Sequence, residues 1–436
     1  MTRLAPVAVA VAFALALALA CSLVSRPARA SDCLASDAKP TAPRRVATLR
    51  EAQKLAYAKR YPDARALYLW VLAREPADET ARTGLARVDA WDGCWGMAER
   101  EFRQVLYADP TNDDARAGLV DLYMWQNEWS LARGQIDAGL ALDPKSETLL
   151  IERARLAHFS FDDTEAIAIV EALDQRKVKD EELEELRDEL FHGEASLALR
   201  ADVYPSDYPN IYTMDAELLQ RWHKFDFTLG AHLVDWTGGG LTDAIVDGER
   251  TLRIGYHPDP GVTVAIEGGF GNPGVVLPRG EFAAELGFPI YRKLTGVLDY
   301  DYWQYSTSES VHILSPTLAY EWNDQWDFAV HAWIVHVGVG DTGVGEWAET
   351  WGANASWKPA PRLTLMVYYT YGVELDRDPT FVQLFQLKGH VVTLSADWLV
   401  THDWGLRALM AGERREQDGV PTIYIGSLGG GAYVRW

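Results

Sequence analysis

The sequence has few cysteines and fewer basic than acidic residues. Its 436 residues include three cysteines, and 63 aspartates and glutamates outnumber 41 lysines and arginines, which gives a formal net charge of −22. Without a CxxC pair, a Cys/His cluster or spaced metal ligands we expect no metal site, and without a phosphate-binding glycine loop we expect no cofactor. The acidic balance argues against nucleic acid as a partner, because nucleic-acid binding needs a basic face.

Beyond residue 30 the sequence also has no apolar run long enough for a membrane-spanning helix. Residues 1–30 combine a basic start at Arg3, an apolar run from Leu4 to Val24 and a small-residue site at residues 28–30, which is the pattern of a secretory signal peptide. We expect this segment to be removed. Two alternatives are a membrane anchor and a lipoprotein cut before Cys21, although residues 18–20 match the usual lipid-attachment box poorly.

Signal cleavage would leave two cysteines, Cys33 and Cys94. An exported compartment permits disulfides, so we expect these two residues to pair. The bond would close a loop of about 60 residues and stabilise the fold by on the order of 4 kcal/mol in the chain-entropy model. The alternative is two unpaired thiols.

Short segments of alternating apolar and polar residues follow one another from residue 196 to residue 436. In residues 293–305, Leu298 and Tyr300 fall on one face of a strand, and Asp299 and Asp301 fall on the other. Turn residues divide the region into about 14 such segments (range roughly 12 to 16), and most reach the roughly 9 to 11 residues that cross a bilayer when tilted. The pattern predicts an antiparallel transmembrane β-barrel, apolar toward lipid and polar toward its interior.

A soluble β-sandwich also alternates, but three features favour the barrel. Aromatic residues stand near many segment ends, as in the interfacial girdles of membrane barrels. The last strand-like run ends on the aromatic residue Trp436, and the region follows an export signal. These aromatic residues are Trp222, Trp236, Tyr256, Tyr291, Trp303, Tyr320, Trp322, Trp357, Trp398 and Trp404. We therefore expect a bacterial outer-membrane protein that contacts outer-membrane lipid, with tight turns and the repeat domain on the periplasmic side.

The front of the chain repeats with a period of 34 residues. A unit of this length holds two antiparallel helices, with small residues where they touch and proline after the second helix. The repeat-motif residues are Trp91, Trp95, Ala98, Pro110, Trp125, Trp129, Ala132 and Pro144. These motifs resemble the tetratricopeptide repeat family, although the first repeat has Tyr61-Pro62 in place of its tryptophan. The resemblance implies a concave protein-binding surface, here for an unknown periplasmic protein.

The sequence thus predicts two domains, an α-helical tetratricopeptide repeat array and a β-barrel. The expected segments are a signal peptide at 1–30, a linker at 31–48, the repeats at 49–175, a linking and capping helix at 176–195 and the barrel at 196–436. The recurrent tryptophans are either interface anchors or core residues, and their fixed position in the repeat favours the core.

The run from Gly431 to Trp436 ends on an aromatic residue and resembles the C-terminal assembly signal of bacterial outer-membrane proteins. Gly431, Val434 and Trp436 carry that resemblance, while Gly429 replaces its usual polar residue. The resemblance implies the barrel assembly machinery as a partner. Together with the repeats and the barrel, this run resembles the YaiO-type outer-membrane proteins. The order of the domains is more distantly similar to the repeat-plus-barrel exporters of surface polysaccharide.

The polar faces of the expected strands are rich in carboxylates. Placing these faces inward puts nine acids in the lumen, namely Asp215, Glu217, Asp226, Glu267, Glu281, Glu285, Asp299, Asp301 and Asp327. Fewer cations, such as Arg253, Arg362 and Arg407, share these faces. The sequence therefore predicts a negative lumen that favours cations.

These features favour a conduit or assembly platform for export of a surface component, with polysaccharide as one example. One alternative is a structural or adhesive barrel with a plugged lumen that recruits periplasmic partners. Another is an outer-rim lipid hydrolase. Its candidate residues would be His312, His331 and His336 with Ser306, Ser308 or Ser310. No local motif joins these residues, so we do not expect an enzyme.

Overall fold

The computed structural model describes most of the chain. The described residues are 33–41, 44–205, 208–238, 245–271, 277–291, 293–306, 309–323, 325–339, 346–377, 384–417 and 420–436. The predicted signal peptide lies outside them. The chain divides into two compact units, one ending at Leu156 and the other running from Ala157 to Trp436.

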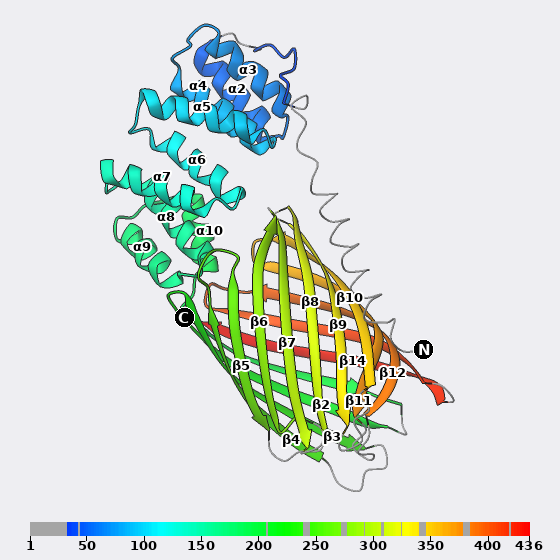
Figure 1. Ribbon diagram of the computed structural model, residues 1–436. Helices are drawn as coiled ribbons and strands as arrows, with labels where there is room; N and C mark the ends of the chain where they lie inside the picture. Colours follow the sequence, from blue (N-terminus) through cyan, green and yellow to red (C-terminus); the bar gives the residue numbers. More distant parts are fainter. Residues whose placement is uncertain are drawn as a thin grey trace. The chain divides into compact units, whose positions relative to one another are not determined.

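Helices fill the front of the chain (Figure 1). The described residues form nine of them: α2 (Arg45–Tyr57), α3 (Tyr61–Leu72), α4 (Glu79–Trp91), α5 (Trp95–Ala108), α6 (Asp113–Trp125), α7 (Trp129–Leu142), α8 (Glu147–Phe159), α9 (Asp163–Gln175) and α10 (Glu181–Glu189). Successive helices pair with the expected period of 34 residues, which confirms the helical half of the predicted fold class. None of the helices among the described residues is long and apolar enough to cross a membrane.

The same cap starts the first helix of three successive repeats. Asp78, Asn112 and Ser146 each accept a hydrogen bond from the backbone N–H three residues later, at 2.9, 2.9 and 3.2 Å. Because the first N–H groups of a helix have no partner inside it, a side-chain acceptor here stabilises the helix by about 1 kcal/mol. The repeat is therefore fixed by its capping residues as well as by its core.

The recurrent motif residues differ in their burial. Fully buried or packed against the core of the repeats are Ala98, Ala132, Trp95 and Trp129. Trp91 and Trp125 keep 38% and 36% of their surface exposed. Pro110 and Pro144 are exposed and follow α5 and α7. Core packing thus accounts for one tryptophan of each repeat and only partly for the other.

A buried arginine organises the start of the first unit. Cys33 and Cys94 form a disulfide there, with their Cα atoms 6.0 Å apart. Next to it, Arg65 is 2% exposed and donates from Nε to Asp89 Oδ1 at 2.6 Å and from Nη1 to the Leu34 carbonyl at 2.9 Å. Arg65 therefore connects the segment that carries Cys33 to helix α4.

Replacing Arg65 tests the importance of this contact. Arg65→Ala leaves the buried Asp89 carboxylate without its cation, so the free energy of unfolding of the helical unit should fall by about 3–5 kcal/mol. The matched control is Arg60→Ala, since Arg60 pairs with Asp63 while its side chain is 63% exposed, and this change should cost under about 1 kcal/mol. Urea titration of the full chain in detergent, followed by far-ultraviolet circular dichroism, measures both, and equal losses would contradict the expectation.

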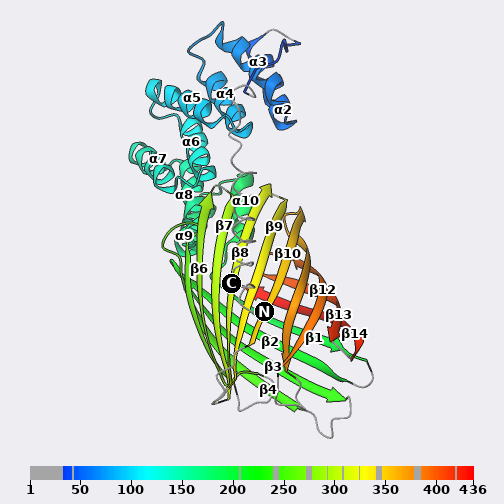
Figure 2. The same cartoon turned by 45° about the vertical axis from the view of Figure 1, so that its right-hand side comes forward.

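Within the described ranges, fourteen strands form one closed antiparallel barrel, which confirms the predicted fold class and strand number. They are β1 (Gly193–Val203), β2 (Pro209–Trp222), β3 (Phe225–Gly238), β4 (Ile245–Tyr256), β5 (Thr263–Gly271), β6 (Gly280–Tyr291), β7 (Leu294–Ser306), β8 (Glu309–Asn323), β9 (Trp326–Val339), β10 (Glu346–Ala360), β11 (Leu363–Arg377), β12 (Leu384–Leu399), β13 (Trp404–Gln417) and β14 (Val420–Arg435). Each strand pairs with its neighbours in sequence, and β1 pairs with β14 (Figure 2). Connections alternate between two ends of the barrel. One is the helix end, where β1 follows α10, and the opposite one is here called the loop end.

The wall has an apolar outer face and a polar inner face. On β7, Leu298 and Tyr300 are 39% and 37% exposed outward, whereas Asp299 and Asp301 line an interior cavity. This alternation follows from the two-residue period of a strand. Because lipid surrounds the outer face, exposure of its apolar residues costs nothing in the membrane.

The seam between β1 and β14 closes the ring. The Trp436 carbonyl accepts hydrogen bonds from the N–H groups of His192 and Gly193 at 2.6 and 3.0 Å, and the Trp436 N–H donates to the Gly193 carbonyl at 3.1 Å. Gly193 leaves room for the Trp436 ring, since a Cβ there would clash with it. Gly431 lies against the backbone of β1, while Val434 and Trp436 are 54% and 49% exposed. The three residues of the assembly-signal resemblance, Gly431, Val434 and Trp436, thus all lie at the seam.

Candidate functional site: the barrel lumen

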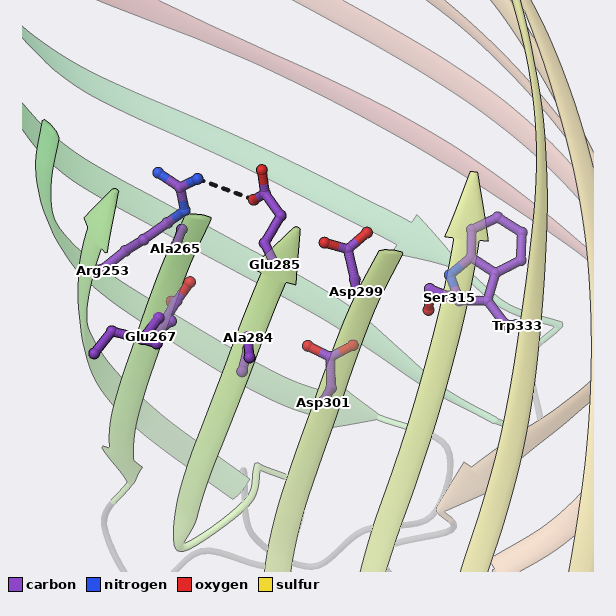
Figure 3. Close-up of a pocket in the computed structure, with 11 residues that line it drawn as sticks. Arg253, Ala265, Glu267, Ala284, Glu285, Asp299, Asp301, Ser315 and Trp333 are labelled. Atoms are coloured by element: carbon purple, nitrogen blue, oxygen red, sulfur yellow. Dashed lines mark hydrogen bonds and ion pairs between the residues drawn. The ribbon is translucent and has the colours of Figure 1, made fainter. Parts of the chain in front are cut away.

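The nine predicted acids all occupy inward positions of the wall. Strand register brings several together, because Glu285 lies opposite Asp299, and Asp299 lies opposite Ser315. Glu267, Glu285, Asp299 and Asp301 line one cavity of about 230 Å³. Figure 3 shows these carboxylates on neighbouring strands facing the same space.

Most of the acids belong to an acidic wall on strands β2 to β7. Its members are Asp215, Glu217, Asp226, Glu267, Glu281, Glu285, Asp299 and Asp301, whereas Asp327 lies apart on β9 near Lys358, with 3.5 Å between the charged atoms. Arg253 donates to Asp226 at 2.6 Å and to Glu285 at 2.9 Å. No cation of the described residues lies within ion-pair distance of Glu267, Glu281, Asp299 or Asp301. The acidic wall therefore carries an uncompensated negative charge.

Two further acids belong to this wall, and the sequence analysis missed them. Asp247 and Glu249 on β4 are 2% and 7% exposed, and Asp247 Oδ2 accepts a hydrogen bond from the Leu277 N–H at 3.0 Å. They share the inward parity of Arg253 on the same strand. That parity is a signal that the sequence contains, since residues 247, 249, 251 and 253 form one polar face of a strand.

The predicted inward cations sit among acids. Arg407 donates to Asp397 at 2.9 Å and to Glu194 at 2.9 Å. Arg362 donates twice to Asp188 of α10, at 2.8 and 2.6 Å. With Arg253 between Asp226 and Glu285, all three cations are neutralised by neighbours. These three cations therefore do not neutralise Glu267, Glu281, Asp299 and Asp301.

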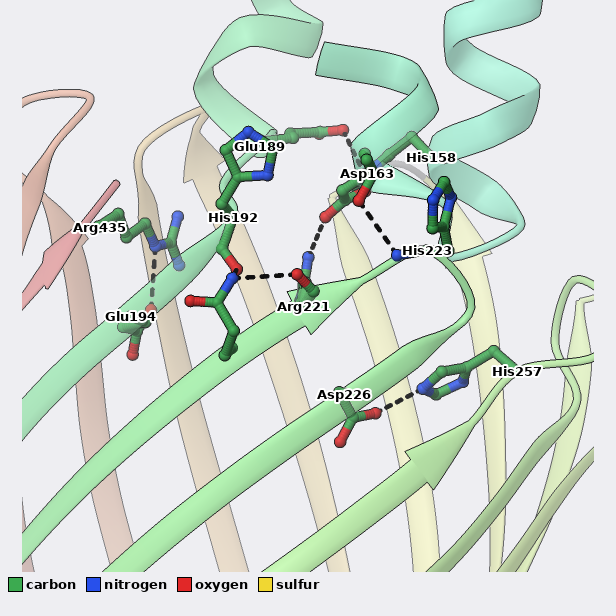
Figure 4. Close-up of polar contacts among 12 residues, drawn as sticks. His158, Asp163, Glu189, His192, Glu194, Arg221, His223, Asp226, His257 and Arg435 are labelled. Atoms are coloured by element: carbon green, nitrogen blue, oxygen red, sulfur yellow. Dashed lines mark hydrogen bonds and ion pairs between the residues drawn. The ribbon is translucent and has the colours of Figure 1, made fainter. Parts of the chain in front are cut away.

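Helices α9 and α10 are attached to the helix end of the barrel. Arg221 of β2 pairs with Asp163 (Figure 4). The ring of His257 stacks on Phe161 with 4.0 Å between their centroids, and Arg362 donates a hydrogen bond to Asp188. A cavity of about 960 Å³ opens between α10 and the barrel strands. The helix predicted for residues 176–195 is thus shorter and packs with the barrel, and so does α9, which the sequence analysis assigned to the repeats.

His158, near the end of α8, lines the same cavity and contacts both α9 and α10. Its Nδ1 lies 2.7 Å from Asp163 Oδ1, and its Nε2 lies 3.5 Å from Glu189 Oε2. Burial opposes the positive charge, but the hydrogen bonds to the two carboxylates outweigh it and raise the pKa of the His158 imidazole from its ordinary 6.5 to about 9. His158 is therefore positively charged at neutral pH.

The described residues among those considered for a lipid hydrolase are divided between the two faces of the barrel wall. His312 and His336 lie side by side on the outer face, with ring centroids 6.0 Å apart. His331 lies on the inner face, where its Nε2 is 2.7 Å from Asn354 Oδ1. Ser310 shares the outer parity of His312, while Ser308 and the side chain of Ser306 lie outside the described part. Among the described residues, no group of His, Cys, Asp and Glu is arranged to hold a metal ion.

The tetratricopeptide repeat family model matches residues 96–150. Comparison with curated protein sequences gives no match.

Several solved structures are similar to parts of the chain. The toluene transporter TbuX of Ralstonia pickettii is 8% identical, with 56% of this chain and 90% of that chain covered and a TM-score of 0.38. An anion-selective porin of Comamonas acidovorans is 7% identical, with coverage of 56% and 98% and a TM-score of 0.35. A tetratricopeptide repeat protein of Parabacteroides merdae is 18% identical, with coverage of 33% and 56% and a TM-score of 0.29. At identities this low, the similarity carries no information about the ligand of this chain.

The raised pKa of His158 gives the helix end a pH-dependent stability. Because the folded pKa lies above the unfolded value of 6.5, the stabilisation is fully present below that pH and is lost as the pH rises through about 9. The loss should be on the order of 2–3 kcal/mol. We expect an NMR titration of histidine-labelled protein, assigned with His158→Gln, to show a midpoint near 9.

Two variants separate the partners of His158. Asp163→Asn should lower the midpoint most, because that carboxylate is nearest, and Glu189→Gln should lower it less. A midpoint near 6.5 in the unaltered protein would show that these contacts do not form.

Proposed function

We propose that the chain is an outer-membrane conduit that exports a surface component such as a polysaccharide, with its repeats in the periplasm. The observation that carries this proposal is the acidic wall. Charged groups that serve only to hold a fold together are paired, because an unpaired carboxylate in a poorly hydrated site raises the free energy. Carboxylates without cations, facing a hollow barrel, instead suit a water-filled path.

Other features support parts of the same proposal. The sequence resembles YaiO-type proteins and, more distantly, exporters of surface polysaccharide, and the resemblance of its terminal run implies insertion by the barrel assembly machinery. The partly exposed Trp91 and Trp125 supply aromatic surface for a periplasmic protein partner. The cavity beside α10 supplies an entrance for cargo at the helix end. We propose no catalytic role, since His331 is separated from His312 and His336 by the barrel wall.

A structural or adhesive barrel with a filled lumen is the second candidate. An apolar cluster on the inner face of β8 and β9, built from Val311, Ile313 and Val337, favours it. The two candidates differ in one property, since only the conduit leaves a continuous aqueous path.

The acidic wall predicts how ions cross the barrel. Purified protein in a planar bilayer should conduct, and its reversal potential in a salt gradient should show a higher permeability for cations than for anions. The preference should fall as salt rises, because the field reaches only about 10 Å at 0.1 M salt. The triple variant Glu267→Gln, Asp299→Asn, Asp301→Asn should lose most of the preference. Asp259→Asn, in the exposed connection after β4, is the matched control and should retain it.

Three outcomes decide between the candidates. Cation preference that the triple variant removes supports the conduit. Anion preference would refute the acidic wall as the selective element. Absence of any conductance would favour the filled, structural barrel.

A further inference from the structure

One part of the lumen is apolar although its surroundings are polar. The inner face of strands β7 to β9 carries Trp303, Val311, Ile313, Val335 and Val337, which pack together. Lumen-facing positions of membrane barrels are normally polar, because they contact water. An apolar patch at such a position therefore marks either internal packing or a surface that binds something.

Beside this patch an aromatic cluster is held in a fixed arrangement. Trp333 stacks on His331 with centroids 5.6 Å apart, and Tyr368 meets both rings edge-on at 6.4 and 5.5 Å. His331 is fixed in turn by Asn354 at 2.7 Å and by Thr317 at 2.9 Å. These contacts leave Trp333 little freedom to rotate.

A glycine makes room for the Trp333 ring. A Cβ on Gly352 would approach that ring to 3.0 Å, so a larger residue here would push the ring toward the lumen axis. The ring therefore lies over β10 and exposes its other side. Figure 3 places Trp333 beside Ser315, next to the cavity that Asp299 lines.

The exposed side of these aromatic rings borders a cavity of about 500 Å³ toward the loop end. Besides the aromatic residues Trp303, Tyr305, Trp333 and Tyr368, three threonines line it, namely Thr350, Thr370 and Thr393. The volume falls within the roughly 300–1,000 Å³ of pockets that bind small ligands. Trp333 lines both this cavity and the acidic one, so the two adjoin along the lumen.

The charges around the cavity compensate one another. Arg415 pairs with Glu413, and Arg200 donates to Asp202 at 2.7 Å. Two cations are thus matched by two anions, in contrast to the uncompensated acidic wall. A ligand that fits this cavity is consequently neutral, with apolar faces for the rings and hydroxyl groups for the threonines.

We propose that the cavity lined by Trp333, Tyr368 and the threonines is a binding subsite for a neutral sugar chain. A pyranose ring presents an apolar C–H face that packs on an aromatic ring, and its edge carries hydroxyls that exchange hydrogen bonds with Thr370 and Thr393. A pyranose ring bound weakly between such partners can dissociate and pass along the lumen, as a conduit requires. The inference rests on the proposed function and names its substrate class.

Calorimetry tests the subsite without requiring conductance. The full chain, solubilised in an amine-oxide detergent that carries no sugar, is titrated with the neutral hexasaccharides maltohexaose and cellohexaose. At least one should bind. Trp333→Ala should weaken that binding by about tenfold or more, and Trp333→Phe should restore most of it, because a smaller ring still offers a stacking face.

Further variants separate the subsite from packing. Thr370→Val and Thr393→Val keep the shape but remove a hydroxyl, and each should weaken binding by about three- to tenfold. Trp398→Ala removes a tryptophan from the lipid face, where it is 51% exposed, and should change nothing. If Trp333 served only in packing, Trp333→Ala would lower the stability of the protein, and Thr370→Val and Thr393→Val would not weaken binding.

The outcomes also distinguish this inference from the conduit itself. Binding that depends on Trp333 and the threonines supports the subsite. No binding of either hexasaccharide overturns it, even if the barrel conducts ions in a bilayer. Binding of toluene but of no sugar also overturns it and assigns the cavity to an apolar ligand. A barrel that binds sugar but never conducts retains the subsite and loses the conduit.

Discussion

The requirement that no backbone polar group be left unpaired in lipid governs this structure. Strands meet it only when their sheet closes, since an open edge would expose a row of N–H and C=O groups to hydrocarbon. Here β1 and β14 pair along ten residues, from Glu194 opposite Arg435 to Val203 opposite Gly426. Once the ring is closed, each strand must place alternate side chains outside and inside. The lumen and its chemistry are consequences of that closure.

The inner face is divided by charge. Strands β2 to β7 carry the acidic wall, and strands β7 to β13 carry paired charges, hydroxyls and aromatic rings. Repulsion among carboxylates raises the free energy of the barrel, and mobile cations from the solvent reduce that repulsion. A path through the lumen therefore passes one region that attracts cations and one that presents neutral surfaces. The acids act over several ångströms, whereas the aromatic cluster acts only by contact.

Much of this arrangement was predictable from the sequence, because the two-residue period of a strand and the 34-residue period of the repeat are local signals. The inward position of Asp299 and the outward position of Tyr300 follow from parity alone. Asp247 and Glu249 were missed although they obey the same rule, since their strand begins next to a glycine-rich loop. The packing of α9 on the barrel depends on contacts such as Phe161 with His257, nearly a hundred residues apart, which no local pattern reveals. The burial of Arg65 beside Asp89 is likewise a property of packed helices.

The central claim is that one face of each strand meets lipid while the other meets a water-filled lumen. Nitroxide scanning of β7 in liposomes tests it most directly, with single cysteines introduced in turn at Leu298, Asp299, Tyr300, Asp301 and Tyr302. Oxygen, which partitions into lipid, should relax the probes at 298, 300 and 302, and a water-soluble nickel chelate should relax those at 299 and 301. Relaxation without a two-residue period, or with the two reagents exchanged, would contradict the account.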